Sequence, residues 1–322
     1  MAVYTHLSAE DLADLIAHYD VGELVSAKGI AEGVSNSNWL LDTSEARFIL
    51  TMYERRIDLG DLPYFLGLLD HLSAKGSPVP RTIHDRAGAA YRMIGDKAVA
   101  LIEFLPGVSV DVPEPEQARN VGKVLAEMHA AAQDFPMARA NDLGPAASAK
   151  VLAECGGEAL ARIDPALGAM IGLSQDIAQN WPSDLPASII HSDLFPDNVL
   201  MLGNKVGGLI DFYFACNDAM AYDLAVTHAA WSFSADGATY RPEIGAALFA
   251  GYQSVRKLTG EEIAALPLLA QGAALRFVSS RAQDWLDTPV DAMVTRKDPM
   301  DFVRRLIFYQ QQGEQVFAEA CT

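Results

Sequence analysis

The sequence predicts an α+β protein with two lobes, a small antiparallel β lobe over residues 1–105 and a larger, mainly helical lobe over residues 106–322. Short apolar runs of strand length, separated by turn residues, dominate the first lobe. Apolar residues at helical spacing dominate the second lobe. The change occurs at Leu105-Pro106-Gly107, which we interpret as a short hinge.

The expected strands of the first lobe fall into two groups around one helix. Apolar residues at helical spacing from Leu62 to Leu72 predict the helix, and the Gly-Ser-Pro-Val-Pro run after it predicts its end. Gly95-Asp96 is a two-residue hairpin signal between the last two strands. The strands are expected at residues 24–27, 38–42, 47–53, 89–94 and 97–102.

The second lobe begins with an amphipathic segment at residues 116–132, which places Val121, Leu125 and Met128 on one face of a helix. A strand pair over residues 199–211, with a turn at Gly203-Asn204, interrupts the helical pattern. Further helices are expected at residues 155–180, 219–234, 242–256, 261–284 and 297–319.

The composition is that of a globular protein, with 50% hydrophobic residues in a chain of 322. We expect no transmembrane helix, because no run of about eighteen apolar residues is free of charge. The first residues have neither a basic start nor an apolar signal core, so a cytoplasmic location is expected. Cys155, Cys216 and Cys321 are far apart and indicate neither a disulfide framework nor a zinc site.

The formal net charge is −18, from 24 basic and 42 acidic residues. This balance argues against a nucleic-acid partner, since binding to phosphate backbones requires a basic patch. No feature indicates a membrane partner, and the oligomeric state is not readable from the sequence. An acidic field favours a cationic or zwitterionic small molecule, although acidic surfaces are also common for solubility alone.

A loop and strand over residues 191–212 combine three polar side chains suited to phosphoryl transfer. Asp193 follows the apolar run 187–190, where a strand ends, and can accept the proton of an attacking hydroxyl. Asn198 lies five residues later in the same loop, and Asp211 ends the next expected strand. An amide oxygen and a carboxylate are hard oxygen ligands suited to Mg2+ between ATP phosphates.

Each of these residues also has a plain structural interpretation. Asp193, Asp197 and Asn198 can cap turns, and His191 can be a core histidine that braces the loop. Taken singly, these interpretations are favoured. Taken together they weaken, because the set recurs by chance in about one chain of this length in several hundred at average residue frequencies.

The segments His191–Leu200 and Ile210–Phe212 resemble the catalytic loop and metal-binding strand of the aminoglycoside phosphotransferase/choline kinase-like enzymes, which have a protein-kinase-like fold. The resemblance implies that Asp193 is the catalytic base and that Asn198 and Asp211 hold Mg2+, with ATP as the phosphoryl donor. It also implies a two-lobed kinase in which the first lobe binds ATP and the second carries the acceptor site.

The similarity within that family is greatest to homoserine kinases of this fold. It implies conversion of L-homoserine to O-phospho-L-homoserine in threonine biosynthesis. Two alternatives remain. One is another small-molecule phosphotransferase, which acts on an aminoglycoside, choline or a sugar, and the second is a non-catalytic nucleotide-binding regulator. Asp223 matches a structural Asp that steadies the catalytic loop. The segments that carry the similarity are residues 32–38, 48–54, 61–69 and 191–231.

The ATP site of the first lobe is expected at a polar hairpin and at the hinge. Glycine permits close approach to phosphates, and Ser and Asn side chains add donors. Taken alone, this segment is an ordinary polar hairpin. By the resemblance, the hinge presents backbone groups to adenine. The expected residues are Gly33, Ser35, Asn36 and Asn38 in the hairpin and Glu103 and Leu105 at the hinge.

One position departs from the usual pattern of such kinases. Thr51 stands where the third strand is expected to carry a Lys that grips the ATP phosphates, and a hydroxyl does not replace a point charge. Homoserine kinases of this type share the substitution. The sequence leaves open which cation replaces this Lys: Arg55, Arg56 or a second Mg2+. In such kinases a Glu of the inserted helix pairs with the Lys, and here Asp61 is the only acidic residue near the start of that helix.

The acceptor site is less defined. A zwitterionic amino acid requires a carboxylate for its ammonium group and a cation or N–H cluster for its carboxylate. Each candidate taken singly is more readily a structural or surface ion-pair residue. The candidates are Asp218, Trp231, Arg276, Arg281 and Asp284.

Overall fold

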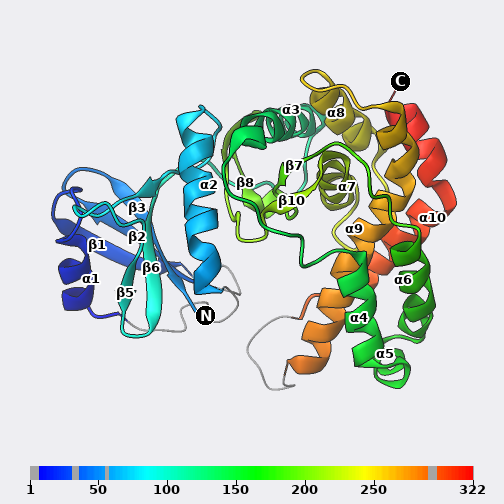
Figure 1. Cartoon of the computed structure of the whole chain (residues 1–322), viewed down its shortest axis with the longest axis horizontal. Helices are drawn as coiled ribbons and strands as arrows, with labels where there is room; N and C mark the ends of the chain where they lie inside the picture. Colours follow the sequence, from blue (N-terminus) through cyan, green and yellow to red (C-terminus); the bar gives the residue numbers. More distant parts are fainter. Residues whose placement is uncertain (1–6, 31–35, 55–57, 289–295, 322) are drawn as a thin grey trace. The chain divides into compact units, whose positions relative to one another are not determined.

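The computed structural model of the 322-residue chain describes residues 7–30, 36–54, 58–288 and 296–321 (Figure 1). The chain forms two compact units. The first comprises Met1–Gly107 together with Gly207–Tyr213, and the second comprises Val108–Val206 together with Phe214–Thr322. The segment Gly207–Tyr213, expected within the second lobe, therefore groups with the first unit, and each unit is described by itself.

The first unit is built on a six-stranded sheet whose recorded pairings are all antiparallel. The sheet order is β1-β2-β3-β6-β4, with β5 also paired to β6. The strand pattern predicted for this lobe is confirmed, with the short β4 as an addition. The strands are β1 (Leu24–Ile30), β2 (Asn36–Thr43), β3 (Arg47–Tyr53), β4 (Thr82–Ile83), β5 (Arg92–Ile94) and β6 (Lys97–Glu103).

One face of this sheet is covered by α1 (Ala9–Ile16), whose start is fixed by a capping box between Ser8 and Asp11. Leu12, Leu15 and Ile16 are buried in one apolar cluster with strand residues that share that face, among them Leu50 and Met52. Since side chains alternate along a strand, the intervening Thr51 points to the opposite face. The sequence analysis did not anticipate α1, because a helix of two turns depends on packing more than on its own pattern.

The inserted helix α2 (Leu62–Ala74) follows the short 3-10 turn η1 (Leu59–Asp61), and its predicted position is confirmed. Its apolar residues are buried, and the chain leaves it through Gly76 in the left-handed region. Two residues later the carbonyl of Pro78 accepts a hydrogen bond from the Leu209 N–H at 2.7 Å. This bond holds the returning segment Gly207–Tyr213 within the first unit.

The second unit is mainly helical. Two short strand pairs accompany the helices, β7 (Ala187–Ile190) with β10 (Cys216–Ala219), and β8 (Val199–Leu202) with β9 (Lys205–Leu209), which continues into the first unit. The helices are α3 (Pro115–Ala131), α4 (Pro145–Cys155), α5 (Gly157–Ile163), α6 (Met170–Gln179), α7 (Met220–Trp231), α8 (Pro242–Gln253), α9 (Gly260–Asp287) and α10 (Met300–Ala320).

Helices α3 and α8 pack with their backbones in contact. A Cβ atom at Gly122 would lie 2.0 Å from the carbonyl oxygen of Leu248, and one at Gly251 would lie 1.8 Å from that of Arg119. Helix α9 packs against α4, α6, α7 and α10 and forms the centre of the unit (Figure 1). Of the helices in the described ranges, α9 is the one long and apolar enough to cross a membrane, and 61% of its most apolar window is buried, as in the core helix of a globular protein.

The expected helix over residues 155–180 is divided in the structure. It consists of α5, the 3-10 helix η3 (Pro165–Ala169) and α6, and the preceding α4 was not expected. Pro165 disfavours a helical conformation at the residue before it, and Asp164 is extended, so α5 ends at Ile163. Gly156, in the left-handed region, separates α4 from α5.

Candidate active site

The loop between β7 and β8 turns sharply at Ser192, whose φ of 60° lies in the left-handed region. This conformation is costly for a residue with a side chain and persists where the surroundings fix it. The Ser192 N–H donates to Asp223 Oδ1 at 2.7 Å, and its Oγ donates to the carbonyl of Phe214 at 2.8 Å. The strained turn is therefore held from two sides.

Asp223 on α7 is the anchor of this loop. Its fully buried carboxylate accepts hydrogen bonds from the N–H groups of His191 and Ser192, both at 2.7 Å, and pairs with Nε2 of His129 at 2.9 Å. Burial raises the pKa of Asp223, but the bonds from His129 and His191 outweigh it and leave the pKa below its usual value. The carboxylate is therefore held ionised, and it fixes the backbone beside Asp193.

His129 extends this anchor to α3 and α8. Its Nδ1 lies 2.9 Å from the hydroxyl of Tyr252, so Tyr252, His129 and Asp223 form one buried chain of hydrogen bonds. Sequence reasoning missed His129, because a single histidine on an amphipathic helix gives no signal of its partner. His191 is fully buried, and its Nδ1 accepts the Asp193 N–H at 3.3 Å, as a brace of the loop would.

Asp193 lies within the loop with a side chain that is 18% exposed. Nη2 of Arg276 lies 3.6 Å from its Oδ1, and Nη1 of Arg276 donates to the Ser192 carbonyl. The guanidinium also packs on the rings of Phe214 and Phe277, at 5.2 and 4.9 Å. Burial raises the pKa of Asp193, and the charge of Arg276 opposes that rise.

Asn198 closes the loop through the 3-10 turn η4 (Pro196–Asn198). Its Nδ2 donates to the Asp193 carbonyl at 2.8 Å and lies 3.4 Å from Asp193 Oδ2. The amide nitrogen is thus committed to Asp193. No donor to its Oδ1 is recorded within the described part of the chain, so the oxygen is the atom left for a cation.

The other residues considered for the acceptor site differ in their surroundings. Trp231 is fully buried and donates from Nε1 to the Leu194 carbonyl at 2.9 Å, so it supports the loop and does not line an open site. Asp218 accepts from Asn141 at 2.6 Å on β10, and Asp284 is exposed on α9. Arg276 contacts the Ser192 carbonyl and Asp193, so its guanidinium is engaged by the loop.

The polar hairpin of the first unit is described in part, since Gly33 and Ser35 lie outside the described residues. Asn36 on β2 is buried, and its Oδ1 has no hydrogen-bond partner among the residues that the structure describes. A buried acceptor without a partner is uncommon and marks a place where a donor or a bound group is expected. Asn38, two residues along the same strand, accepts from the hydroxyl of Thr51 at 2.8 Å.

Thr51 belongs to a neutral hydrogen-bonded cluster on the face of the sheet opposite α1. The hydroxyl of Tyr213 lies 3.0 Å from that of Tyr53, with edge-to-face rings, and Thr51 also bonds to Tyr213. Burial raises the pKa of Tyr213 to about 12 and that of Tyr53 well above its usual value, so both stay protonated. Where such kinases usually carry a cation, this unit presents hydroxyl groups.

Replacing Thr51 with Val tests the role of this cluster. Because the variant loses two hydrogen bonds, to Asn38 and Tyr213, and no charge, we expect a loss of about 1–3 kcal/mol in unfolding free energy. We expect the KM for ATP to change by less than about tenfold. Urea unfolding and initial rates over an ATP series measure both quantities, with Thr51→Ser as the matched control that keeps the hydroxyl. A rise of about 100-fold in KM would contradict a purely structural role.

Asp211 is exposed, has a φ of 65° and lies two residues after the end of β9. A Cβ atom at Gly208 would lie 2.6 Å from Leu105 Cδ1, so this strand packs closely on the expected hinge. Glu103 donates its N–H to the Arg81 carbonyl at 3.0 Å and accepts the Arg81 N–H through Oε2 at 3.2 Å. Asp211, Glu103 and Leu105 thus belong to the same unit, whereas Asp193 and Asn198 belong to the other.

The cation expected near the phosphate site is not identified by the first unit. Arg55 and Arg56 lie outside the described residues. Lys97, which sequence reasoning did not single out, pairs with the buried carboxylate of Glu54, which also accepts from Ser37 Oγ at 2.6 Å. Asp61 lies at the N-terminal end of α2 and makes no side-chain cap bond there.

Within the described ranges, no three His, Cys, Asp or Glu side chains gather into a metal-binding group. A Mg2+ site of a kinase does not require one, because its ligands are one or two protein oxygens, waters and phosphate oxygens. Asn198 and Asp211 each carry a side-chain oxygen of the type that such a site uses.

Comparison with known proteins decides the family. Residues 26–258 match the model of the phosphotransferase enzyme family. The chain belongs to this family. It is 49% identical over 312 residues to the homoserine kinase of Methylobacterium radiotolerans, with 97% of both chains covered. The homoserine kinase of Rhizobium etli is 49% identical, with 97% of each chain covered. That of Gluconobacter oxydans is 48% identical, with 96% of this chain and 98% of its own covered. The protein is therefore an ATP-dependent kinase.

Solved structures show the same fold at low identity. Spectinomycin phosphotransferase in complex with ADP and spectinomycin has a TM-score of 0.68 at 14% identity, with 98% of each chain covered. Choline kinase from Cryptosporidium parvum gives the same values. Amicoumacin kinase, in complex with AMP-PNP and Ca2+, has a TM-score of 0.65 at 14% identity over 96% of this chain and 94% of its own. The two-lobed α+β kinase fold predicted from the sequence is confirmed.

Proposed function

We propose that the protein transfers the terminal phosphoryl group of Mg-ATP to the side-chain hydroxyl of L-homoserine, giving O-phospho-L-homoserine for threonine biosynthesis in the cytoplasm. The observation that carries this proposal is identity of about one half to homoserine kinases along 97% of the chain. The similarity spans both units, so it includes the residues around the acceptor as well as those around ATP.

Asp193 is proposed to orient the acceptor hydroxyl and to accept its proton. Phosphoryl transfer has a loose transition state, so catalysis depends more on position than on base strength. The contacts of Asp193 suit that role. Its backbone is fixed through Asp223, and its carboxylate lies between Arg276 and Asn198 while remaining partly exposed.

Asn198 and Asp211 are proposed to hold Mg2+, which supplies charge compensation between the ATP phosphates. Asn198 has its oxygen left for a cation, and Asp211 presents an exposed carboxylate. Two residues lie between Asp211 and Phe214, whose carbonyl accepts a hydrogen bond from Ser192 Oγ. The chain therefore continues from Asp211 into the segment that supports the turn at Ser192.

The remaining ATP contacts are proposed for the first unit. Asn36 and Asn38, with Gly33 and Ser35, would face the phosphates, and the backbone between Glu103 and Leu105 would face the adenine. The buried, unpartnered Oδ1 of Asn36 supports a bound group at this hairpin. Since Thr51 is neutral, Mg2+ would neutralise more of the phosphate charge here than it does in kinases that carry a Lys on this strand.

Replacing Asp211 with Ala is expected to weaken Mg-ATP binding by at least about tenfold and to lower turnover by about 10³-fold, since a metal ligand is lost. Calorimetric titration with Mg-ATP and single-turnover rates measure the two effects. Asp197→Ala, which removes a neighbouring exposed carboxylate of the loop, is the charge-matched control. Unchanged Mg-ATP affinity in the Asp211 variant would remove Asp211 from the metal site.

Two other functions make different predictions. Another acceptor of the same family would give higher turnover with an aminoglycoside, choline or a sugar than with homoserine. A non-catalytic nucleotide-binding regulator, which the neutral Thr51 favours, would bind Mg-ATP and release no ADP with any acceptor. Incubation with Mg-ATP and L-homoserine, followed by 31P NMR of the product, tests the proposal directly. A phosphomonoester of homoserine supports it, and unchanged ATP contradicts it.

A further inference from the structure

We propose that Arg281 binds the α-carboxylate of the acceptor and so selects a hydroxyl amino acid over alcohols that lack a carboxylate. This inference rests on the proposed function and assigns one specificity residue to it. Arg281 and Asp193 both belong to the second unit.

The guanidinium of Arg281 is held rigidly from two directions. Its Nη1 donates to the carbonyl of Asp298 at 2.9 Å and to Oδ2 of Asp301 at 2.8 Å. The group also lies over the ring of Phe302, 4.7 Å from its centroid. The side chain is 13% exposed, so the arginine is partly desolvated and fixed in orientation before any ligand binds.

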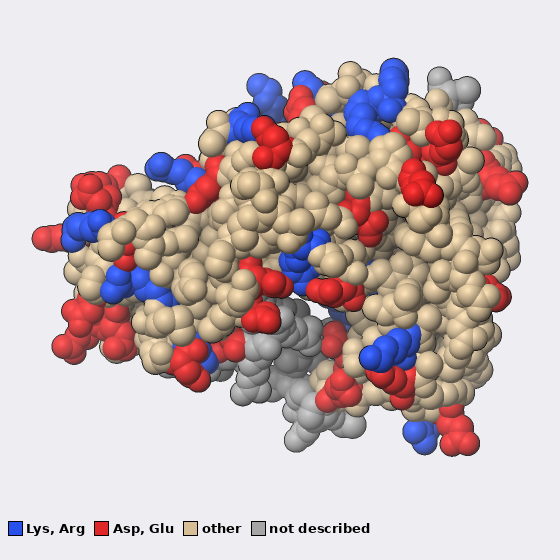
Figure 2. Space-filling view, in the orientation of Figure 1, with Lys and Arg blue, Asp and Glu red and all other residues tan. Residues whose placement is uncertain are grey.

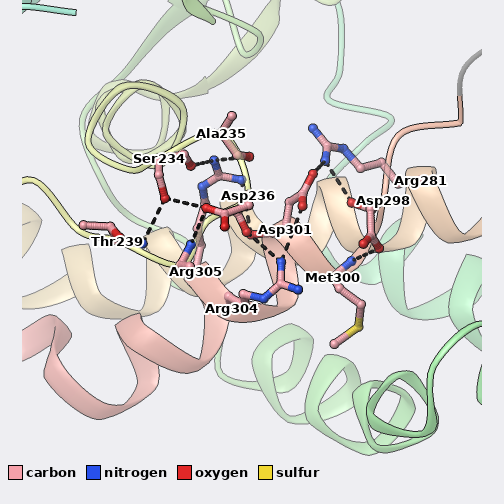
Figure 3. Close-up of polar contacts among 11 residues, drawn as sticks. Ser234, Ala235, Asp236, Thr239, Arg281, Asp298, Met300, Asp301, Arg304 and Arg305 are labelled. Carbon is pink, nitrogen blue, oxygen red and sulfur yellow. Dashed lines mark hydrogen bonds and ion pairs between the residues drawn. The ribbon is translucent and has the colours of Figure 1, made fainter. Parts of the chain in front are cut away.

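One edge of this guanidinium has no recorded partner. Both hydrogen bonds use Nη1, and Figure 3 shows the other terminal nitrogen directed away from Asp298 and Asp301. For Nε and Nη2, no acceptor is recorded among the residues that the structure describes. These two nitrogens form the planar fork that binds a carboxylate through two parallel hydrogen bonds. An arginine so arranged is preorganised for an anionic group.

The position of Arg281 relative to the catalytic loop suits a short acceptor. Phe302, on which it lies, packs against Phe195 and Phe277, with ring centroids 6.0 and 4.7 Å apart, and Phe195 is two residues after Asp193. Arg281 and Asp193 also interact electrostatically. Packed aromatic rings therefore connect the segment that carries the proposed base with the guanidinium of Arg281. An acceptor with a hydroxyl at one end and a carboxylate at the other requires a base and a cation in the same part of the protein.

Neighbouring arginines are occupied differently. Arg276 bonds to the Ser192 carbonyl and faces Asp193. Arg305 is buried and donates to the carbonyls of Ser234 and Ala235.

Arg304 also reaches Asp301, at 3.5 Å, but it is 43% exposed and donates to the Asp236 carbonyl at 2.7 Å (Figure 3). It therefore offers a matched control, because its removal takes a charge from the same carboxylate. The face of the molecule in Figure 2 shows acidic and basic side chains interspersed, with no continuous basic patch. On this face, an anionic group therefore meets single basic side chains and not an extended basic surface.

The test compares L-homoserine with propanolamine, which keeps the hydroxyl and the ammonium group but lacks the carboxylate. The wild-type protein is expected to favour homoserine by about 100-fold or more in kcat/KM, because buried donors are left unpaired by the analogue. Arg281→Gln is expected to lose about that factor with homoserine, mainly through KM, and to change by less than about twofold with propanolamine. Arg281→Lys, which keeps the charge and loses the fork, is expected to lie between.

Arg304→Gln is expected to change both substrates by less than about twofold. If Arg281→Gln lowers kcat/KM equally for the two substrates, Arg281 has a structural role and the inference is overturned while the kinase function stands. Equal use of both substrates by the wild-type protein overturns it as well, without needing any variant to fold. Absence of homoserine turnover in the wild-type protein, by contrast, overturns the proposed function itself.

Discussion

Asp193→Asn is expected to lower kcat by about 10²- to 10⁴-fold, the usual contribution of a positioned general base. The Kd for Mg-ATP is expected to stay within about twofold, because Asp193 acts on the acceptor and not on the nucleotide. The amide is nearly isosteric, so the hydrogen bonds that Asn198 and Arg276 make to the carbonyls of Asp193 and Ser192 are retained. Single-turnover rates and calorimetric titration separate the two quantities.

Asp197→Asn is the control for this prediction. Asp197 lies in the same loop, is exposed, and acts on Asp193 as a like charge. Its neutralisation is expected to leave kcat within about twofold. A near-native kcat in the Asp193 variant, with the Asp197 variant unchanged, would show that Asp193 is not the base.

Asp223→Asn is expected to destabilise the protein by about 3–5 kcal/mol, the cost of removing one partner from a buried charged network. Asp223 accepts from two backbone N–H groups and pairs with His129. Both carboxylate oxygens of Asp223 accept hydrogen bonds, whereas the amide of Asn has one acceptor oxygen. Its NH2 group would therefore face one of the N–H donors. Urea unfolding measures the loss, and Asp218→Asn, which changes a carboxylate bonded to Asn141, is expected to cost about 1 kcal/mol.

The same carboxylate makes stability dependent on pH. Because the pKa of Asp223 is lowered on folding, its contribution is present above the unfolded value of about 4 and is lost as pH falls through the folded value. The wild-type protein is therefore expected to lose stability on acidification below that range more steeply than the Asp223 variant does. If the unfolding free energy of the two proteins fell equally with pH in the acid range, Asp223 would not be an ionised anchor.

Much of the fold was predictable because its signals are local. The apolar run over residues 47–53, the helical spacing of Leu62–Leu72 and the turn at Gly203-Asn204 each predict a segment from neighbouring residues alone. The expected helix over residues 155–180 was wrong, because it ran through Pro165, which marks the break before η3. The helix α1 was not readable, because its stability comes from Leu50, Met52 and other residues of distant strands.

The candidate site divides in the same way. Asp193 and Asn198 belong to one short loop, so their spacing alone indicates a joint role. The residues that hold this loop come from far along the chain: His129 is 94 residues from Asp223, and Arg276 is 84 residues from Ser192. No local pattern indicates such pairs, and a single sequence leaves a histidine or arginine of this kind without an assigned partner.

The central claim is that homoserine is the acceptor, and a competition experiment tests it most directly. The protein is incubated with limiting Mg-ATP and an equimolar mixture of L-homoserine, choline, ethanolamine and an aminoglycoside, and the phosphorylated products are quantified by mass spectrometry. O-phospho-L-homoserine is expected to be the dominant product, with the others near the level formed without enzyme. Preferential phosphorylation of any other alcohol, or ATP consumption without O-phospho-L-homoserine, would contradict the claim.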